Sequence, residues 1–246
     1  MEDCIRFEHV TVRYGEHQAL NDFDFAIGTG EFLTIIGRSG CGKTSALRLI
    51  NGLNSPDEGK VYVHGEDVSK TDLIRLRRSI GYAIQEVGLF PHMNVRDNIA
   101  YVPSLSKMWT KAESREHTTS LLETVGLDPE IAKRYPHELS GGQRQRVGIA
   151  RALAAKPDIL LMDEPFGSVD EITRRSLQTE ILRLHKKLGI TIVFVTHDIN
   201  EAILLGSRML VMDAGRAVQT GDPSYIREHP VNEFVRQLMP HRGNDD

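Results

Sequence analysis

The chain has 246 residues, of which 40% are hydrophobic and 26% are charged, and its formal net charge is −4. This is the composition of an ordinary globular protein, and the length allows one large domain or two small ones. The negative charge excludes the broad basic surface typical of nucleic-acid binders, so we expect no nucleic-acid partner. Two cysteines, Cys4 and Cys41, are too few for a disulfide framework and indicate a reducing compartment.

The sequence carries no signal for membrane insertion or export. No apolar run approaches the roughly 20 residues that cross a bilayer. The N-terminus also lacks the basic-then-apolar order of a signal peptide. We therefore expect a cytoplasmic protein that reaches a membrane only peripherally, through a partner.

The first third of the chain alternates short apolar stretches with turns. Residues 4–14, 23–28 and 60–65 show the period-two pattern of strands, which predicts an antiparallel sheet. Residues 32–37 (FLTIIG) predict a buried strand, and residues 43–53 predict a helix.

Helical spacing takes over between about Val95 and Ala155. Two buried strands follow, at residues 158–165 and 191–198, with a helix at 171–189 between them. Strand, helix and strand in this order, with nearly continuous apolar strands, are typical of a parallel α/β sheet. Residues 208–221 predict a hairpin, and a polar tail follows. We expect an α/β core with a helical insert.

Residues 37–44 (GRSGCGKT) match the phosphate-loop pattern G-x-x-x-x-G-K-[ST], after a strand and before a helix. Gly40 and Gly42 let backbone N–H groups turn inward, and the helix N-terminus adds partial positive charge. Lys43 is expected to reach the β- and γ-phosphates of ATP or GTP, and Thr44 to bind Mg²⁺. The alternative is a glycine-rich turn that only caps a helix. The nucleotide-binding residues predicted here are Gly37, Arg38, Ser39, Gly40, Cys41, Gly42, Lys43, Thr44 and Ser45.

Two adjacent carboxylates end the apolar stretch ILLMDE, residues 159–164. Ligands of α/β folds bind at the carboxyl ends of such strands. Asp163 suits the Mg²⁺ shell through water, and Glu164 is the candidate general base for an attacking water. An acidic pair on a surface loop is usually only solvated, but the preceding buried strand favours the catalytic interpretation.

Gln85 and His197 also follow predicted strands. Either residue alone is explained equally well as a hydrogen-bonded cap. Together with the two motifs they predict a γ-phosphate site, in which Gln85 orders water or Mg²⁺ and His197 donates to the terminal phosphate. The predicted catalytic residues are Glu164, His197 and Gln85, and the predicted Mg²⁺ ligands are Thr44, Gln85 and Asp163.

Residues 139–143 (LSGGQ) form a second glycine loop at the start of a helix, with no lysine and no acidic Mg²⁺ ligand nearby. It is half of a phosphate site. Together with the phosphate loop, ILLMDE, the glutamine and the TH pair at 196–197, LSGGQ resembles the nucleotide-binding subunit of an ABC transporter, over residues 5 to 225.

The resemblance implies an α/β fold with a P-loop NTPase (RecA-like) core, a flanking antiparallel β subdomain and an inserted α-helical signature subdomain. We expect an ATPase domain at residues 3–225, with the helical subdomain at about 88–157. A short C-terminal helix or tail is expected at residues 226–246. The paired CBS regulatory domains of some relatives are not expected in a chain that stops at Asp246.

In that family two subunits face head to tail, so the resemblance implies a homodimer, or a pair of similar subunits, with two shared ATP molecules. Ser140 and Gly142 are expected to contact the γ-phosphate in trans, beside Gly141 and Gln143. The alternative role of this loop is helix capping alone.

Two further residues match positions of that family. Tyr14 matches an aromatic ring that stacks on adenine, although it is equally explained as an aromatic residue of the sheet. Asp170, in GSVD, matches the acidic residue of the dimer-interface loop. That loop more commonly reads S-A-L-D, so Val169 is a small departure.

The resemblance also implies separate transmembrane permease subunits and, indirectly, an extracellular or periplasmic solute-binding protein. Leu89, Phe90 and Met93, in the stretch that follows Gln85, suit contact with a permease helix. The alternative is that they pack within the helical insert.

Residues 80–105, 134–174 and 232–239 resemble osmoprotectant importers, which move glycine betaine, choline, carnitine or proline-type solutes. Importers of methionine, polyamines or other amino acids stay open. A soluble ABC ATPase of DNA repair or translation would carry a coiled-coil insert or two cassettes, and neither is visible. A P-loop kinase or GTPase leaves LSGGQ unexplained.

Overall fold

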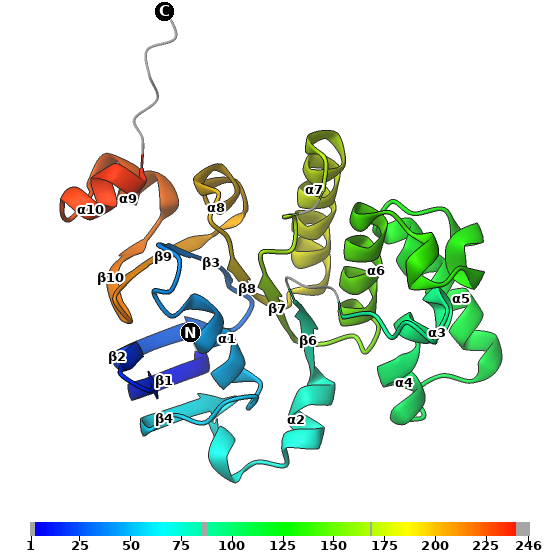
Figure 1. The fold of residues 1–246 in the computed structure, drawn as a ribbon, viewed down its shortest axis with the longest axis horizontal. Coiled ribbons are helices and arrows are strands. Elements are labelled where there is room, and N and C mark those ends of the chain that lie inside the picture. Colours follow the sequence, from blue (N-terminus) through cyan, green and yellow to red (C-terminus); the bar gives the residue numbers. More distant parts are fainter. Residues whose placement is uncertain (1–2, 85–87, 168, 240–246) are drawn as a thin grey trace, which may run out of the picture. The chain divides into compact units, whose positions relative to one another are not determined.

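The computed structural model describes residues 3–84, 88–167 and 169–239 (Figure 1). The chain forms two compact units. The first unit joins residues 1–73 to residues 191–246, and the second comprises residues 74–190.

The antiparallel sheet expected for the first third of the chain is confirmed in the first unit. Its strand order is β2 (His17–Gly28), β1 (Asp3–Tyr14), β4 (Glu58–Val63) and β5 (Glu66–Asp67). The β1–β2 pairing is long because both strands bury an alternating apolar face, on which Phe7 and Phe23 meet edge to face with ring centroids 5.2 Å apart.

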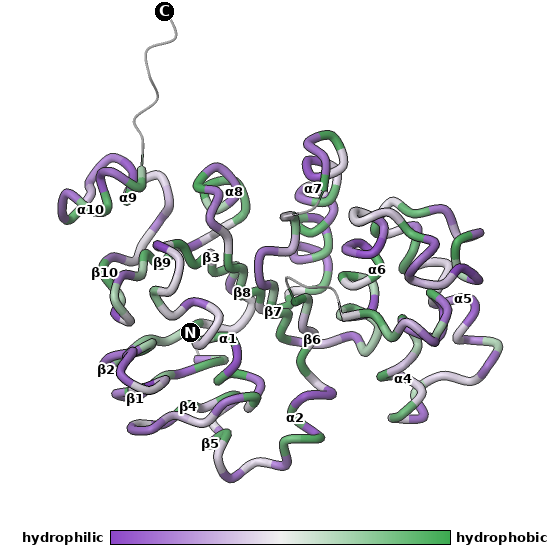
Figure 2. Tube along the Cα trace, viewed as in Figure 1, coloured by the Kyte–Doolittle hydropathy of each residue, from purple (hydrophilic) through white to green (hydrophobic). Residues whose placement is uncertain are grey.

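The same unit holds a second set of strands that delivers the phosphate loop. Their order is β10 (Arg216–Gly221), β9 (Arg208–Asp213), β3 (Phe32–Gly37) and β8 (Thr191–Val195). β3 runs parallel to both β8 and β9, and β10 returns antiparallel to β9, which confirms the predicted hairpin. β3 and β8 are almost wholly buried and hydrophobic (Figure 2), as expected for strands covered on both faces.

Helix α1 (Lys43–Ile50) follows the loop after β3, as predicted. A short 3₁₀ helix, η1 (Val68–Lys70), follows β5. After β8 come α8 (Ile199–Leu205), α9 (Pro223–Glu228) and α10 (Glu233–Leu238).

The C-terminal segment differs from the polar tail expected from the sequence. Ile226, Val235 and Met239 are at most 1% exposed and belong to one apolar cluster with Ile36 of β3. The apolar pairs Phe234–Val235 and Leu238–Met239 lie four positions apart, which is helical spacing, but the segment is too short for this pattern to predict burial. The segment is therefore part of the first unit's core.

The second unit contains the predicted helical stretch. α2 (Leu73–Ser79) leads into β6 (Ile80–Ala83), which pairs in parallel with β7 (Ile159–Asp163). The helices are α3 (Val95–Ile99), α4 (Tyr101–Leu105), α5 (Lys111–Thr124), α6 (Gly141–Leu153) and α7 (Glu171–Leu188), with 3₁₀ turns η2 (Pro129–Lys133) and η3 (Pro136–Glu138). Of the helices within the described ranges, none combines the length and apolar composition that a bilayer crossing needs.

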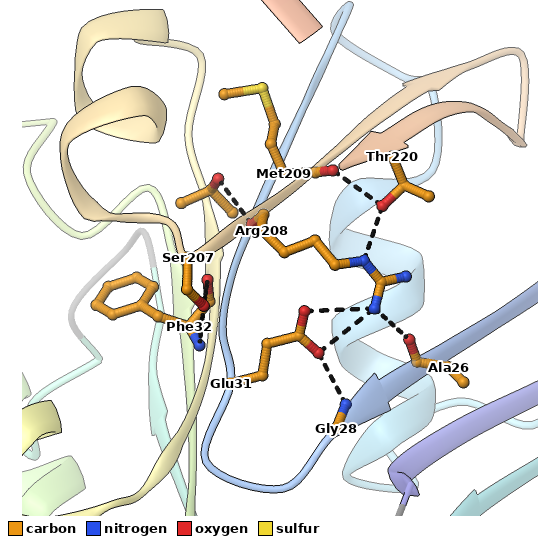
Figure 3. A network of polar contacts seen from close by, with 9 residues as sticks. Ala26, Gly28, Glu31, Phe32, Ser207, Arg208, Met209 and Thr220 are labelled. Atoms are coloured by element: carbon orange, nitrogen blue, oxygen red, sulfur yellow. Dashed lines mark hydrogen bonds and ion pairs between the residues drawn. The ribbon is translucent and has the colours of Figure 1, made fainter. Parts of the chain in front are cut away.

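Arg208 ties the two sheets of the first unit together (Figure 3). Its guanidinium donates to Thr220 Oγ1 at 2.9 Å and to the Ala26 carbonyl at 3.2 Å, and it lies 3.3 Å from Glu31 Oε1. The carboxylate of Glu31 in turn accepts from the Gly28 N–H at 2.8 Å. One side chain thus joins β2, β9, β10 and the entry to β3.

We predict that Arg208→Met lowers the free energy of unfolding by about 2 kcal/mol, because a half-buried carboxylate and a carbonyl lose a charged donor. Urea unfolding measures this change. Arg216→Met, on the exposed edge of β10, is the matched control and is expected to change stability by less than about 0.5 kcal/mol. Equal losses in the two variants would contradict the bridging role of Arg208.

Candidate nucleotide-binding site

The phosphate loop has a backbone that only glycine permits at two points. Gly37 has φ 154° and Gly42 has φ 105°. A Cβ at Gly37 would lie 2.2 Å from the Met212 carbonyl oxygen, and one at Gly42 would lie 2.2 Å from that of Ala19. The loop is therefore fitted closely against β9 and β2, whereas at Gly40 (φ 79°) a Cβ would meet nothing within 4 Å.

Lys43 lies inside this loop, with only 7% of its surface exposed. Its ammonium donates to the carbonyl oxygens of Gly37, at 2.8 Å, and Arg38, at 3.0 Å. The Arg38 carbonyl also accepts from the Cys41 N–H at 3.2 Å. A buried cation held by neutral carbonyls is well placed to exchange them for phosphate oxygens.

Cys41 is a buried free thiol in the same loop. Burial raises the pKa of this thiol, and the nearby Lys43 ammonium opposes that effect. The thiol therefore stays neutral and adds no negative charge to the loop.

His197 lies at the same edge of the sheet as the phosphate loop. β3 and β8 are adjacent and parallel, with Ile35 opposite Val195. Gly37, the last residue of β3, and His197, two residues after β8, therefore lie at the carboxyl ends of neighbouring strands. The residue before the histidine is fixed, because Thr196 Oγ1 donates to the buried Glu201 carboxylate at 2.6 Å. The His197 side chain itself is exposed.

Tyr14 ends β1 with 48% of its surface exposed, and its hydroxyl accepts from the Asn54 amide. Tyr14 is thus an aromatic residue of the sheet, paired with His17 of β2, as the alternative to adenine stacking expected. Its exposed ring is also compatible with adenine stacking.

The second unit carries the predicted carboxylates at the end of β7. Asp163 is 5% exposed, and Glu164 follows it half-buried. Glu164 has φ 46°, the left-handed region that non-glycine side chains disfavour. Its carbonyl accepts from Gln145 Nε2 at 3.4 Å and from the Gly167 N–H at 3.3 Å. Other non-glycine residues, among them Asp22, Lys107 and Ala214, have similar positive φ values, so this conformation does not by itself mark a functional residue.

Ser140 is the N-cap of α6. Its hydroxyl accepts from the Gln143 N–H at 3.2 Å, and Gln143 Oε1 accepts from the Ser140 N–H at 2.9 Å, which is a reciprocal capping box. Gly141 and Gly142 form the first turn behind the exposed serine. Ser140 therefore does cap α6. Because its hydroxyl oxygen acts as an acceptor in the cap, the hydroxyl proton can still be donated to an anion.

Asp170 is likewise an N-cap, for α7. Its carboxylate accepts from the Thr173 N–H at 3.0 Å, and this hydrogen bond is the main cause of its lowered pKa. The carboxylate is exposed and Val169 beside it is buried.

Residues 90–94 are held by a residue that the motifs did not indicate, whereas Gln85 itself lies outside the described residues. The amide of the fully buried Asn98 donates to the carbonyls of Phe90, Met93 and Asn94 and accepts from the Phe90 N–H. Phe90 also packs on Tyr101, with ring centroids 4.7 Å apart. A lone asparagine in a helical pattern gives no sequence signal for such a role.

Residues 20–167 match the family model described as ABC transporter. The chain belongs to the ABC transporter family. It is 49% identical over 236 residues to the glycine betaine/carnitine/choline transport ATP-binding protein OpuCA of Bacillus subtilis (96% of this chain, 62% of that one). It is also 48% identical over 235 residues to the glycine betaine uptake system ATP-binding protein YehX of Escherichia coli (96% and 76%).

The fold agrees with solved cassettes of this family. The dimeric post-hydrolysis structure of the ATP-binding cassette MJ0796 with ADP and Pi has a TM-score of 0.84 and 33% identity, covering 89% of this chain and 98% of that one. The predicted α/β P-loop fold is thereby confirmed. This chain spans about three fifths of the length of several curated relatives that it matches.

We predict that Lys43→Ala weakens ATP binding by at least about tenfold, because a charge-assisted contact to phosphate is lost. Equilibrium titration with ATP measures the affinity. Lys60→Ala, on the exposed part of β4, is the control. Retained affinity in Lys43→Ala would mean that this loop does not hold the phosphates.

The strain at Glu164 predicts a second result. Glu164→Gly is expected to be more stable than Glu164→Ala by about 1 kcal/mol, because only the alanine keeps a Cβ at positive φ. Thermal unfolding of the two variants measures the difference. An alanine variant as stable as the glycine variant would remove the evidence for strain.

Proposed function

We propose that this chain is an ATPase subunit that powers an ABC importer of osmoprotectants such as glycine betaine, choline or carnitine. The observation that carries this proposal is the Lys43 ammonium, buried against the carbonyls of a glycine-dependent loop at the carboxyl edge of parallel strands. Such a loop suits a nucleoside triphosphate, and the family membership makes ATP the nucleotide.

The first unit binds the nucleotide. The N–H groups of the loop and the N-terminus of α1 face the phosphates, Lys43 reaches the β- and γ-phosphates, and Tyr14 stacks on adenine. Thr44, Asp163 and Gln85 are the proposed Mg²⁺ ligands. The ion would neutralise charge on the β- and γ-phosphates. The hydroxyl of Thr44, in the first turn of α1, and the carboxylate of Asp163, at the end of β7, are oxygen donors that suit this ion.

The proposed catalytic groups are Glu164 and His197. Glu164 accepts a proton from the attacking water, and His197 donates a hydrogen bond to the γ-phosphate. Each group follows a parallel strand of its own unit, where side chains of an α/β fold meet their ligand. The position of Glu164, directly after the buried Asp163 at the end of β7, supports its role.

The site is completed by a second copy. Ser140 and Gly142 of one chain contact the γ-phosphate bound to the other, and Asp170 lies at the interface of this homodimer. The exposed serine cap at the start of a 13-residue helix supports this, since it offers a hydroxyl proton and helix N–H groups to an anion. The dimeric structure of a related cassette with ADP and Pi is a second support.

ATP thus supplies contacts that exist only in the closed dimer, and hydrolysis removes them. The dimer would attach to separate permease subunits at the cytoplasmic face of the membrane. Its closing and reopening would move these subunits between inward-facing and outward-facing states, and they would receive solute from an external binding protein. The names of the OpuCA and YehX relatives support an osmoprotectant as the solute. Importers of other small solutes share the same chemistry.

Mixing two inactive variants tests the shared site. Ser140→Arg and Glu164→Gln are each expected to abolish hydrolysis alone. In a mixed dimer, the intact Glu164 of one chain meets the intact Ser140 of the other. Random pairing of independent sites therefore restores about a quarter of the wild-type ATPase rate.

The rate of phosphate release measures this complementation, and retained ATP binding by each variant serves as the control for folding. A site contained within one chain gives no recovery on mixing, because every chain then carries a defect. A mixture as inactive as its components would therefore overturn the shared site.

A further inference from the structure

The C-terminal helix α10 reaches the phosphate loop through a side-chain contact that no motif predicts. The guanidinium carbon of Arg38 lies 4.9 Å from the centroid of the Phe234 ring. This is within the roughly 6 Å at which a cation is attracted to an aromatic face. Both residues belong to the first unit.

Arg38 is also the residue whose backbone holds the lysine. Its carbonyl oxygen accepts from the Lys43 ammonium at 3.0 Å and from the Cys41 N–H at 3.2 Å. Arg38 thus makes two kinds of contact: its carbonyl holds groups within the loop, and its exposed side chain lies over the Phe234 ring.

Phe234 is itself firmly placed. Its neighbour Val235 is fully buried, and Met239 is 1% exposed; both lie in the apolar cluster with Ile36, the residue before Gly37. Phe234 packs partly buried against the same cluster. The helix therefore supports the strand that delivers the loop as well as the loop's arginine.

We propose that Phe234 is a positioning residue for nucleotide binding. By holding the Arg38 guanidinium, it keeps the Arg38 carbonyl and the Lys43 ammonium in the arrangement from which the lysine meets phosphate. Nucleotide affinity then depends on the docking of α10, which lies far from every binding motif in the sequence. This inference rests on the proposed function for the identity of the ligand, ATP.

A double-mutant cycle on the full chain tests the proposal, with ATP affinity measured by calorimetry in EDTA so that no hydrolysis occurs. Phe234→Leu keeps an apolar side chain but removes the aromatic face, and is expected to raise the Kd about two- to fivefold. Phe234→Tyr and Phe234→Trp keep the face and are expected to bind like the wild type. Gln237→Ala, on the exposed side of α10, is the matched control.

The decisive comparison is the Arg38→Ala background, in which Phe234→Leu is expected to have no further effect on the Kd. An unchanged Kd for Phe234→Leu, or the same loss with and without Arg38, would overturn the proposal and leave Phe234 as a packing residue. If Phe234→Leu does not fold, loss of affinity in Phe234→Trp would overturn it equally. A wild-type chain that binds no ATP would refute the proposed function instead.

Discussion

The buried Lys43 ammonium donates hydrogen bonds to the carbonyls of its own loop, and the shape of the candidate phosphate site depends on them. A buried ammonium is costly unless polar groups surround it, so the loop must curve around the lysine. That curvature requires the backbone of Gly37 and Gly42, where any side chain would collide with a neighbouring strand. The loop therefore holds a cation ready for phosphate, in a shape set by the strands around it.

Several candidate functional residues also have a structural role. Ser140 and Asp170 both cap helices, because their side chains accept hydrogen bonds from backbone N–H groups of the first turn. In each case the cap fixes the orientation of the polar group at a helix N-terminus, where an anion or a partner chain can reach it. A residue that caps a helix can therefore also contact a nucleotide or a partner chain. The proposed shared site needs no loops other than those that precede α6 and α7.

The sequence predicted the strands, the glycine loop between β3 and α1 and the position of Asp163 at the end of β7, because each is a local pattern of apolar runs and glycines. It did not predict the burial of Val235 and Met239 or the contact of Phe234 with Arg38, which depend on packing between residues almost 200 positions apart. Nor did it indicate the four hydrogen bonds of Asn98 or the positive φ of Glu164. Isolated residues such as Asn98 leave no periodic signal, so only the three-dimensional structure reveals them.

In the proposed function, two copies of the chain complete each other's reaction centre. The most direct test of this arrangement is an experimental structure with ATP and Mg²⁺, in which the distance from each Ser140 Oγ to the nearest γ-phosphate oxygen is measured. We predict a hydrogen-bond distance of about 3 Å to the nucleotide held by Lys43 of the other copy. A serine within that distance of the nucleotide on its own chain, or nucleotide enclosed by a single copy, would contradict the account.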